Sequence, residues 1–345
     1  MHGAGDLTTL DEKRDSAKLF HGWIVLDKPV GLGSTQAVSA VKRALRDAGA
    51  PKMKVGHGGT LDPLASGVLP IAIGEATKLA GRMLDATKVY DFTIRFGEQT
   101  DTLDREGEVV ATSDARPRLA QVEAVLSSFT GEIEQVPPAY SALKIDGKAA
   151  YARARAGEVL EMKSRRVTVH ALGLGSREEN PHPDLLPQAG EEEWAAIREP
   201  SPARGRGLGE GLPSITLSAT VSKGTYIRSL ARDIAVALGT VGHVSMLRRT
   251  RAGPFSIEQA ISLDFLHEAA KARQLDGAVR PLMAALDDIP ALPVTPGQAQ
   301  LLRQGQKLAG FPAPPGLCLA CSDGSPVALV EATADGLKVV RGFNL

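Results

Sequence analysis

The sequence predicts an α+β protein with a second, small β domain at its C-terminal end. Strict alternation of apolar and polar residues, as in 88–97, is typical of a half-buried strand. Apolar residues spaced three and four positions apart, as in 226–239, are typical of an amphipathic helix. After residue 288, short strand-like runs follow one another with Asp-Gly turns between them. These observations favour one large mixed domain followed by a small all-β unit.

The first predicted elements are a strand over 22–29, which ends at Pro29, and a helix over 34–49. Ser34 or Thr35 is the expected N-cap of this helix, and Gly49 is its expected C-cap. Next comes the strand 88–97, which places Tyr90 on the same face as three apolar side chains, Phe92, Ile94 and Phe96.

A second alternating strand is predicted over 213–221, and a helix over 226–239 follows it. Ile227, Leu230, Ile234 and Leu238 share one side of that helix, and Gly239 ends it. Ser256 and Gln259 have the spacing of a capping box, which predicts a helix over 257–270.

Composition shifts divide the chain into an N-terminal extension (1–21), a large domain of a size that can hold a catalytic site (22–288) and a small C-terminal domain (289–345). Within the large domain, residues 173–213 are rich in Gly, Pro, Glu and Arg and lack apolar periodicity. We interpret them as a long surface insertion without a packed core.

Length and composition indicate a globular protein, since 345 residues with 43% apolar residues can bury a sizeable core. The polar start of the chain does not resemble a signal peptide, and no apolar run approaches the roughly 20 residues of a membrane helix. We therefore expect a cytoplasmic protein. Cys318 and Cys321 form a single C-x-x-C without a second ligand pair, so we interpret them as strand residues and expect no metal site.

Charge is unevenly distributed although the formal net charge is zero. Basic residues outnumber acidic ones in 142–166 and in 222–251, whereas acidic residues gather in 97–108 and 177–200. Such segregation gives either a basic face for nucleic acid or ordinary solvated helix faces, and charge alone leaves both open.

A glycine-rich stretch, "GHGGTLDP", places one carboxylate, Asp62, directly before a proline. It lacks the Gly-Lys-Ser/Thr ending of a phosphate loop. No Gly-x-Ser-x-Gly nucleophile elbow accompanies it, which excludes the common esterase arrangement. Asp62 is therefore either a turn former, a role for which Asp before Pro is well suited, or a catalytic group.

Several segments, taken in order, resemble the motifs of the bacterial TruB-type tRNA pseudouridine synthases across residues 22–258. They are "GWIVLDKPVG", "VGHGGTLDPLASGVLPIAIGEATKL", "KVYDFTIRFGEQTDTLDREG", "PPAYSALKIDGKAAYARARAGE", "SKGTYIRSLARDIAVALG" and "HVSMLRRTRAGPF". The resemblance implies a mixed, largely antiparallel central sheet flanked by helices. More weakly, it implies that the C-terminal domain is a small β-barrel of the PUA type that binds RNA.

The implied reaction converts uridine 55 in the T-loop of tRNA to pseudouridine. It breaks the bond from N1 of uracil to C1′ of the ribose and reconnects the base through C5. The reaction is redox-neutral, so no cofactor is expected, and it needs one carboxylate beside the ribose. The resemblance assigns this role to Asp62.

The family also implies roles for other residues of this chain. Tyr90 and Tyr226 surround the flipped base, Leu247 forms its apolar wall, Arg228 pairs with Asp62, and His57 supports the opened RNA loop. The resemblance also implies that four basic residues contact the RNA backbone: Lys28, Lys78, Lys144 and Arg155. The implied partner is the T-loop and T-stem of tRNA, bound by a monomer without an obligate protein partner.

Three departures from the family pattern stand out: Gly33 and Gly58 replace common hydroxyl residues, and the insertion at 173–213 is longer than usual. Two alternatives remain open. One is an RNA-binding or RNA-folding protein without catalysis. The other is a guide-dependent synthase, although such relatives carry long basic extensions whereas this chain ends "VVRGFNL".

Overall fold

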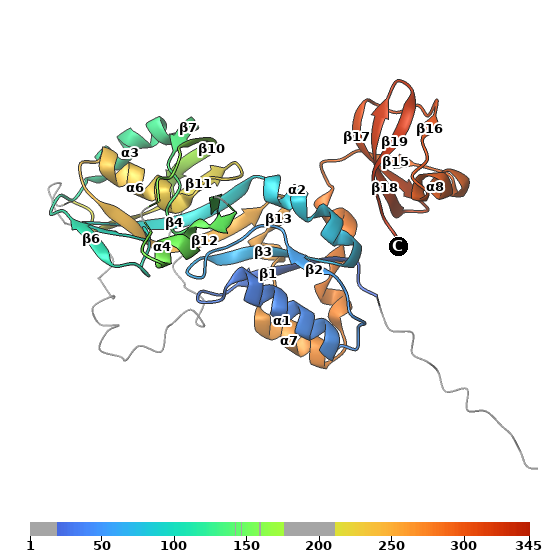
Figure 1. Cartoon of the computed structure of the whole chain (residues 1–345), viewed down its shortest axis with the longest axis horizontal. Coiled ribbons are helices and arrows are strands. Elements are labelled where there is room, and N and C mark those ends of the chain that lie inside the picture. The colour runs from blue at the N-terminus through green and yellow to red at the C-terminus, as the bar shows by residue number, and fades with distance from the viewer. Residues whose placement is uncertain (1–18, 142, 146, 159, 176–210) are drawn as a thin grey trace, which may run out of the picture.

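A computed structural model describes residues 19–141, 143–145, 147–158, 160–175 and 211–345. Its main feature is a mixed sheet, in which ten strands pair among the described residues (Figure 1). The main path runs in the order β14 (Arg280–Pro281), β1 (Gly22–Lys28), β3 (Ser66–Ile73), β12 (Gly242–Ala252), β4 (Lys88–Phe96), β11 (Ser214–Val221), β10 (Arg165–Leu174) and β7 (Gly131–Gln135).

Among the described strands of this sheet, one neighbouring pair is parallel, that of β12 with β3. All other pairs are antiparallel, including β2 (Val55–His57) with β3 and β13 (Phe255–Ser256) with β12. The predicted fold class, a mixed and largely antiparallel sheet with flanking helices, is confirmed.

The β1 and β3 half of the sheet is buried on both faces. On one face Ile24 and Ile71 pack against α1 (Ser34–Asp47) and α7 (Leu263–Lys271), which lie side by side beneath the strands (Figure 1). On the other face Trp23 and Val68 meet the 3-10 segments η1 (Gly74–Leu79) and η6 (Leu282–Ala285) and helix α2 (Ala80–Asp85). Burial on both faces explains why β3 is apolar from Val68 to Ile73 and does not alternate.

The other half of the sheet is covered on one face by α6 (Ile227–Ala237) and α3 (Leu119–Leu126). Phe92, Ile94 and Phe96 of β4 point into this core, as the alternation predicts. The apolar side of α6 also packs here, and Gly239 follows its C-cap at φ +73°, again as predicted. Two small hairpins and one short helix lie between β4 and β10 in the chain: β5 (Glu98–Thr100) with β6 (Val109–Thr112), β8 (Lys144–Ile145) with β9 (Lys148–Ala149), and α4 (Ala150–Arg155).

One predicted N-cap and one predicted helix start are wrong, although α1 begins at Ser34 as predicted. Helix α1 has Gly33 as its N-cap, because the hydroxyl of Ser34 is bonded to Leu61 and does not cap the helix. The Ser256 and Gln259 pair caps only the 3-10 turn η4 (Ile257–Gln259), and α7 starts afresh at Leu263 with Ser262 as its N-cap.

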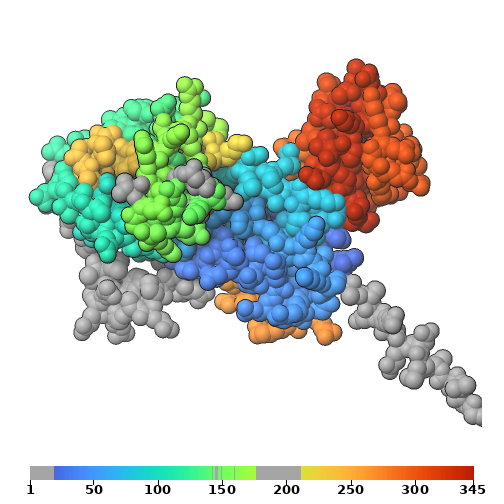
Figure 2. Space-filling view, in the orientation of Figure 1, coloured from blue at the N-terminus to red at the C-terminus, as the bar shows by residue number. Residues whose placement is uncertain are grey.

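A five-stranded sheet forms a separate C-terminal lobe (Figure 2). Its order is β15 (Ala291–Pro293), β17 (Gly316–Ser322), β18 (Ser325–Thr333), β19 (Gly336–Gly342) and β16 (Leu308–Ala309), with α8 (Pro296–Arg303) against it. It agrees with the predicted small β unit of the PUA type. Asp323 and Gly324 make the β17–β18 turn, whereas Ala334 and Asp335 make the β18–β19 turn and Gly336 begins β19.

The last residues of the chain attach this lobe to the rest of the molecule. Phe343 is 1% exposed and packs in the same core as Trp23. The Asn344 amide donates to Glu75 at 2.8 Å, and the Lys78 ammonium donates to the carbonyl of Gly342 at 2.8 Å. The lobe is therefore fixed to η1 by an apolar anchor and by polar bonds.

Most of the predicted insertion, like residues 1–18 of the predicted extension, lies outside the described residues. At its start, β10 continues through Leu174, so the strand includes the first two residues assigned to the insertion. Among the helices of the described residues, none combines the length and the apolar composition that a bilayer-spanning helix needs.

Candidate active site

The glycine-rich turn that carries Asp62 connects β2 to β3 and is held by its neighbours on several sides. Ser34 bonds to Leu61 twice: its hydroxyl accepts from the amide at 2.8 Å and donates to the carbonyl at 2.9 Å. Gly59 has φ +136°, a conformation that favours glycine. At Gly58 a Cβ would lie 2.5 Å from the Cβ of Met83, so the hydroxyl residue common in the family does not fit here. The turn is thus held by side-chain hydrogen bonds and by close packing.

Two buried cations lie behind this turn. Lys28 is fully buried and donates to the carbonyls of Pro29 at 2.8 Å, Leu32 at 2.7 Å and Pro63 at 3.3 Å. Burial, opposed by the charge of Asp62, lowers the pKa of Lys28 to about 8. The predicted contact of Lys28 with the RNA backbone does not fit this position, because all three of its contacts are internal carbonyls.

Arg249 of β12 is the second buried cation, with 1% of its surface exposed. It donates from Nε to the Val68 carbonyl at 2.7 Å, and from its two other nitrogens to the carbonyls of Gly59 at 3.2 Å and Thr60 at 3.3 Å. Its Nη1 also lies 3.4 Å from the Tyr90 hydroxyl. Arg249 therefore connects the turn to β3 and β4.

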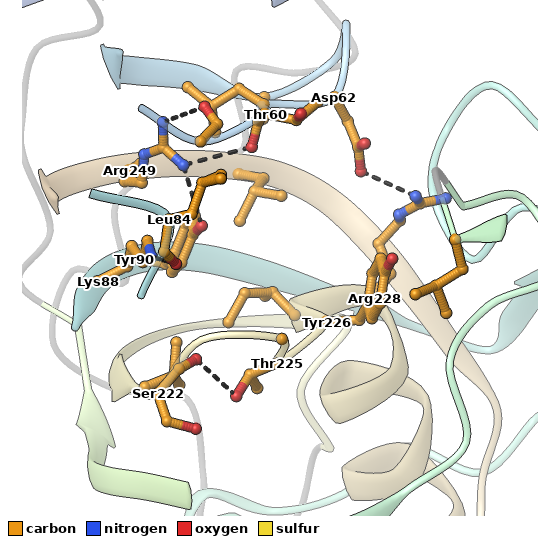
Figure 3. Close-up of a pocket in the computed structure, with 18 of the residues that line it drawn as sticks. Thr60, Asp62, Leu84, Lys88, Tyr90, Ser222, Thr225, Tyr226, Arg228 and Arg249 are labelled. Atoms are coloured by element: carbon orange, nitrogen blue, oxygen red, sulfur yellow. Dashed lines mark hydrogen bonds and ion pairs between the residues drawn. The ribbon is translucent and has the colours of Figure 1, made fainter. Parts of the chain in front are cut away.

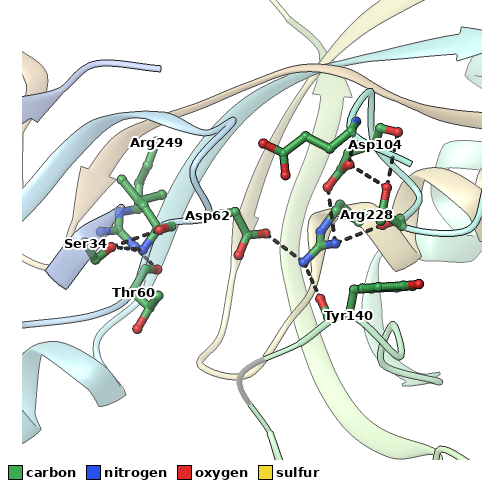
Figure 4. A network of polar contacts seen from close by, with 10 residues as sticks. Ser34, Thr60, Asp62, Asp104, Tyr140, Arg228 and Arg249 are labelled. Atoms are coloured by element: carbon green, nitrogen blue, oxygen red, sulfur yellow. Dashed lines mark hydrogen bonds and ion pairs between the residues drawn. The ribbon is translucent and has the colours of Figure 1, made fainter. Parts of the chain in front are cut away.

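Asp62 forms an ion pair with Arg228 at the start of α6, with 2.8 Å between Oδ2 and Nη2 (Figure 4). The Arg228 side chain is only 6% exposed and also pairs with Asp104 at 3.2 Å. It donates further to the carbonyls of Thr102 at 2.8 Å and Tyr140 at 2.9 Å. Asp62 itself is 39% exposed, so one carboxylate is accessible while the cation that holds it is not.

A pocket of about 330 Å³ opens beside Asp62 (Figure 3). Tyr90 from β4, Tyr226 from the N-cap of α6 and Leu247 from β12 line it together with Asp62 and Arg228. Residues from four separate segments of the chain thus meet in one cavity. Its walls also include Thr60, Leu84, Lys88, Arg165 and Arg249.

Arg165 and Lys88 add positive charge to this pocket. The guanidinium carbon of Arg165 lies 4.8 Å from the ring centroid of Tyr226, in cation–π geometry. Lys88 donates to the carbonyls of Leu84 and Ala86, each at 2.6 Å, and burial lowers its pKa to about 8. Both residues are part of the quoted motifs or lie beside them, but one lysine or arginine among many carries no distinguishing signal in the sequence.

The remaining predicted residues lie away from the pocket lining. His57 is half-buried at the end of β2, and burial together with the charge of Arg249 lowers its pKa. Lys78 is bound to Glu75 at 2.6 Å and to Gly342, so it joins the C-terminal lobe and is not a free surface cation. Arg155 is exposed on α4. The backbone of Lys144 lies in β8, and its side chain is outside the described residues.

Sequence reasoning did not select Asp104, which is the second carboxylate on Arg228. It lies inside the motif "QTDTLDREG" but is one of several acidic residues there. In the structure the turn at Leu103, with φ +63°, directs Asp104 inward, where it also accepts bonds from Thr102 at 2.6 Å and from the amide of Glu106 at 3.0 Å. Only the fold distinguishes it from its exposed neighbours.

Cys318 and Cys321 both lie in β17, as predicted for strand residues. Within the described part of the chain, no group of three or more His, Cys, Asp or Glu residues is arranged to hold a metal ion. The chemistry that the described pocket offers is that of one accessible carboxylate, held by a buried arginine, beside aromatic and apolar surfaces.

Comparison with known proteins identifies the family. The model described as "TruB family pseudouridylate synthase (N terminal domain)" matches residues 43–186, and the "tRNA pseudouridylate synthase B C-terminal domain" matches residues 228–287. The chain is 58% identical to a tRNA pseudouridine synthase B of Novosphingobium aromaticivorans, over 94% of this chain and 97% of that protein. It is 56% identical to the protein of that name from Zymomonas mobilis, over 94% and 96%.

Solved structures with the same fold are more distant in sequence. An H/ACA RNP protein, in a complex with a substrate RNA that contains 2′-deoxyuridine, superimposes with a TM-score of 0.64 at 24% identity. That match covers 94% of this chain and 86% of the other, and it supports the fold alone. The identities with the two bacterial proteins extend over nearly the full length, and this chain therefore belongs to the TruB family of pseudouridylate synthases.

Proposed function

We propose that this protein converts uridine 55 in the T-loop of tRNA to pseudouridine, with Asp62 as the catalytic carboxylate. The observation that carries the proposal is the placement of one accessible carboxylate in a hydrogen-bonded turn, 2.8 Å from a buried arginine, at the wall of a pocket that two tyrosines line. Because the base leaves C1′ and then returns to it, the reaction needs a group that holds the sugar but no activated water.

The pocket walls hold the flipped base. Extrusion of a base from a folded loop costs a few kcal/mol, and stacking on an aromatic ring returns about 1 to 3 kcal/mol. Tyr90 and Tyr226 supply such rings, and Leu247 supplies an apolar wall. His57 supports the opened RNA loop from outside the pocket.

The RNA backbone is bound outside the pocket by exposed Arg155, by Lys144 and by the small C-terminal domain, residues 289–345. The partner is the T-loop and T-stem of tRNA, and the enzyme acts on it as a cytoplasmic monomer without cofactor or guide RNA. The assignment of Asp62, and not of Asp104, follows from exposure: Asp104 is 9% exposed and fully engaged with Arg228 and its own turn.

The Asp62→Asn variant tests this proposal. Asn keeps the shape of the side chain and still suits the turn, but it is a poor nucleophile and has no charge. We expect affinity for a T-arm RNA close to that of the wild type and no pseudouridine at position 55, measured by nucleoside analysis and site mapping. Asp91→Asn, on the same sheet but outside the pocket lining, is the matched control and should be active.

Two outcomes would contradict the proposal. Pseudouridine formation by pure Asp62→Asn protein above a small fraction of the wild-type rate would return Asp62 to the role of a turn former. Wild-type protein that binds the T-arm but modifies it only when a guide RNA is added would point to the guide-dependent class.

A further inference from the structure

Arg249 is a buried cation without a carboxylate partner among the described residues. It is 1% exposed, and no Asp or Glu of the described chain comes within 4.0 Å of its guanidinium. Its neighbour Arg248 shows the ordinary alternative, since it pairs with both oxygens of Asp27, at 2.9 and 3.2 Å. A charge removed from water without a counter-ion is costly, so the environment of Arg249 calls for an explanation.

The hydrogen bonds of Arg249 all go to neutral acceptors. Three are the carbonyls of Val68, Gly59 and Thr60, and the fourth is the hydroxyl of Tyr90 (Figures 3 and 4). Neutral acceptors orient the guanidinium without cancelling its charge. The cation is thus fixed in place at the pocket wall, and its charge remains available to whatever occupies the pocket.

The charge balance of the pocket points the same way. Four cationic side chains line it (Lys88, Arg165, Arg228 and Arg249), whereas Asp62 is the one carboxylate among its lining residues. Asp62 is already paired with Arg228. The positive charge of Arg249 acts on neighbouring side chains: it contributes to the lowered pKa values of Lys28, Lys88 and His57. A pocket of this kind favours an anionic occupant.

The proposed reaction creates such an occupant. When the N1–C1′ bond breaks, the bonding pair stays on N1 and the base becomes a uracil anion, while C1′ bonds to the Asp62 carboxylate. The anion then attacks C1′ through C5, Asp62 leaves with the pair it had supplied, and the C5 proton is transferred to N1. Atoms and electrons balance, and the intermediate stage contains a detached anion that must be held while it turns.

We infer that Arg249 stabilises the detached uracil anion through its fixed, unpaired positive charge, and that it also positions the turn bearing Asp62. The inference rests on the proposed function. Preorganised charges of this kind act where charge develops in the transition state, and removing one costs about 100-fold or more in rate. Lys88, at the same end of the pocket in Figure 3, adds to the same field.

The test compares two substrates that differ in the acidity of the leaving base. T-arm RNA with uridine or 5-fluorouridine at position 55 is converted under single-turnover conditions, and loss of the starting nucleoside is measured. We expect Arg249→Met to slow uridine on the order of 100-fold but 5-fluorouridine by less than about 10-fold, because the fluorinated anion needs less stabilisation. Arg249→Lys keeps the charge, so it should slow both substrates by one common factor.

Arg248→Met is the matched control, since it removes a partly buried arginine from the same strand outside the pocket lining. It should show no difference between the substrates. If Arg249→Met does not fold, Arg249→Gln carries the same comparison with a polar side chain. Equal slowing of both substrates by the neutral variants would overturn the inference and leave Arg249 as a holder of the turn. A wild-type protein inactive on both RNAs would instead overturn the proposed function.

Discussion

Replacing Asp104 with Asn removes one of the two carboxylates that hold the buried Arg228. The side chains of Asp104 and Arg228 are 9% and 6% exposed, so their pairing is screened little by water. Breaking a buried ion pair costs about 3 to 5 kcal/mol. The lower end applies here, because Arg228 keeps Asp62 and two carbonyls. We therefore expect about 3 kcal/mol less free energy of unfolding, measured by urea denaturation.

The effect on catalysis follows from the same geometry. With Asp104 neutral, Arg228 is held less firmly, and Asp62 moves with it. A displacement near 1 Å costs on the order of 100-fold in rate. Because Asp104 does not line the main pocket, affinity for RNA should stay close to that of the wild type. Single-turnover pseudouridine formation and filter binding on T-arm RNA measure the two effects.

Glu106→Gln is the control for Asp104→Asn. It removes an exposed carboxylate from the same turn and should change stability by less than about 0.5 kcal/mol. A turnover rate of Asp104→Asn within twofold of the wild type would refute the idea that Asp62 depends on Asp104 through Arg228.

Three further predictions follow from the contacts described above. Ser34→Ala leaves the amide and the carbonyl of Leu61 without their partner. The free energy of unfolding should therefore fall by about 1 to 3 kcal/mol, and turnover should slow. Ser39→Ala, on the exposed face of α1, is the control and should change neither. Phe343→Ala should cost about 3 to 5 kcal/mol in thermal unfolding, and Val340→Ala, 54% exposed in β19 just before Phe343, should cost much less. The pKa of Lys88 is about 8 when folded and 10.5 ordinarily, so the unfolded chain binds more protons between these pH values and the free energy of unfolding should rise with pH there. Lys88→Met should reduce that rise in urea unfolding at pH 8 and pH 10, and an unchanged rise would contradict the assignment.

The alternating strands and the helix 226–239 could be predicted from the sequence because their patterns are local. Tyr90 and its apolar neighbours repeat every second residue, and the spacing of Leu230 and Ile234 repeats every turn of a helix. The N-cap of α1 depended instead on a tertiary partner. The hydroxyl of Ser34 is drawn to Leu61 and away from its own helix, which no local pattern reveals.

Some residues of the candidate site could be identified from the sequence, and others could not. Asp62 and Arg228 stand out because their motifs resemble a known family, and the structure brings them within 2.8 Å. Lys28 could not be placed from its motif, because a lysine beside a proline is surface-exposed in most contexts and is fully buried here. Asp104 and Arg249 were missed since their roles depend on burial and on partners far away in the chain.

The position of strand β12 determines when the active site can assemble during synthesis of the chain. It lies between β3 and β4, which follow each other in the chain but do not pair, and it pairs with both of them. Residues 242–252 therefore join the two halves of the sheet, and they also supply Leu247 and Arg249 to the pocket. A chain still being synthesised on the ribosome contains Asp62 long before it contains β12. Nascent chains that end before residue 242 should accordingly have no assembled site. Catalytic activity should appear only when nearly all of the large domain has left the exit tunnel.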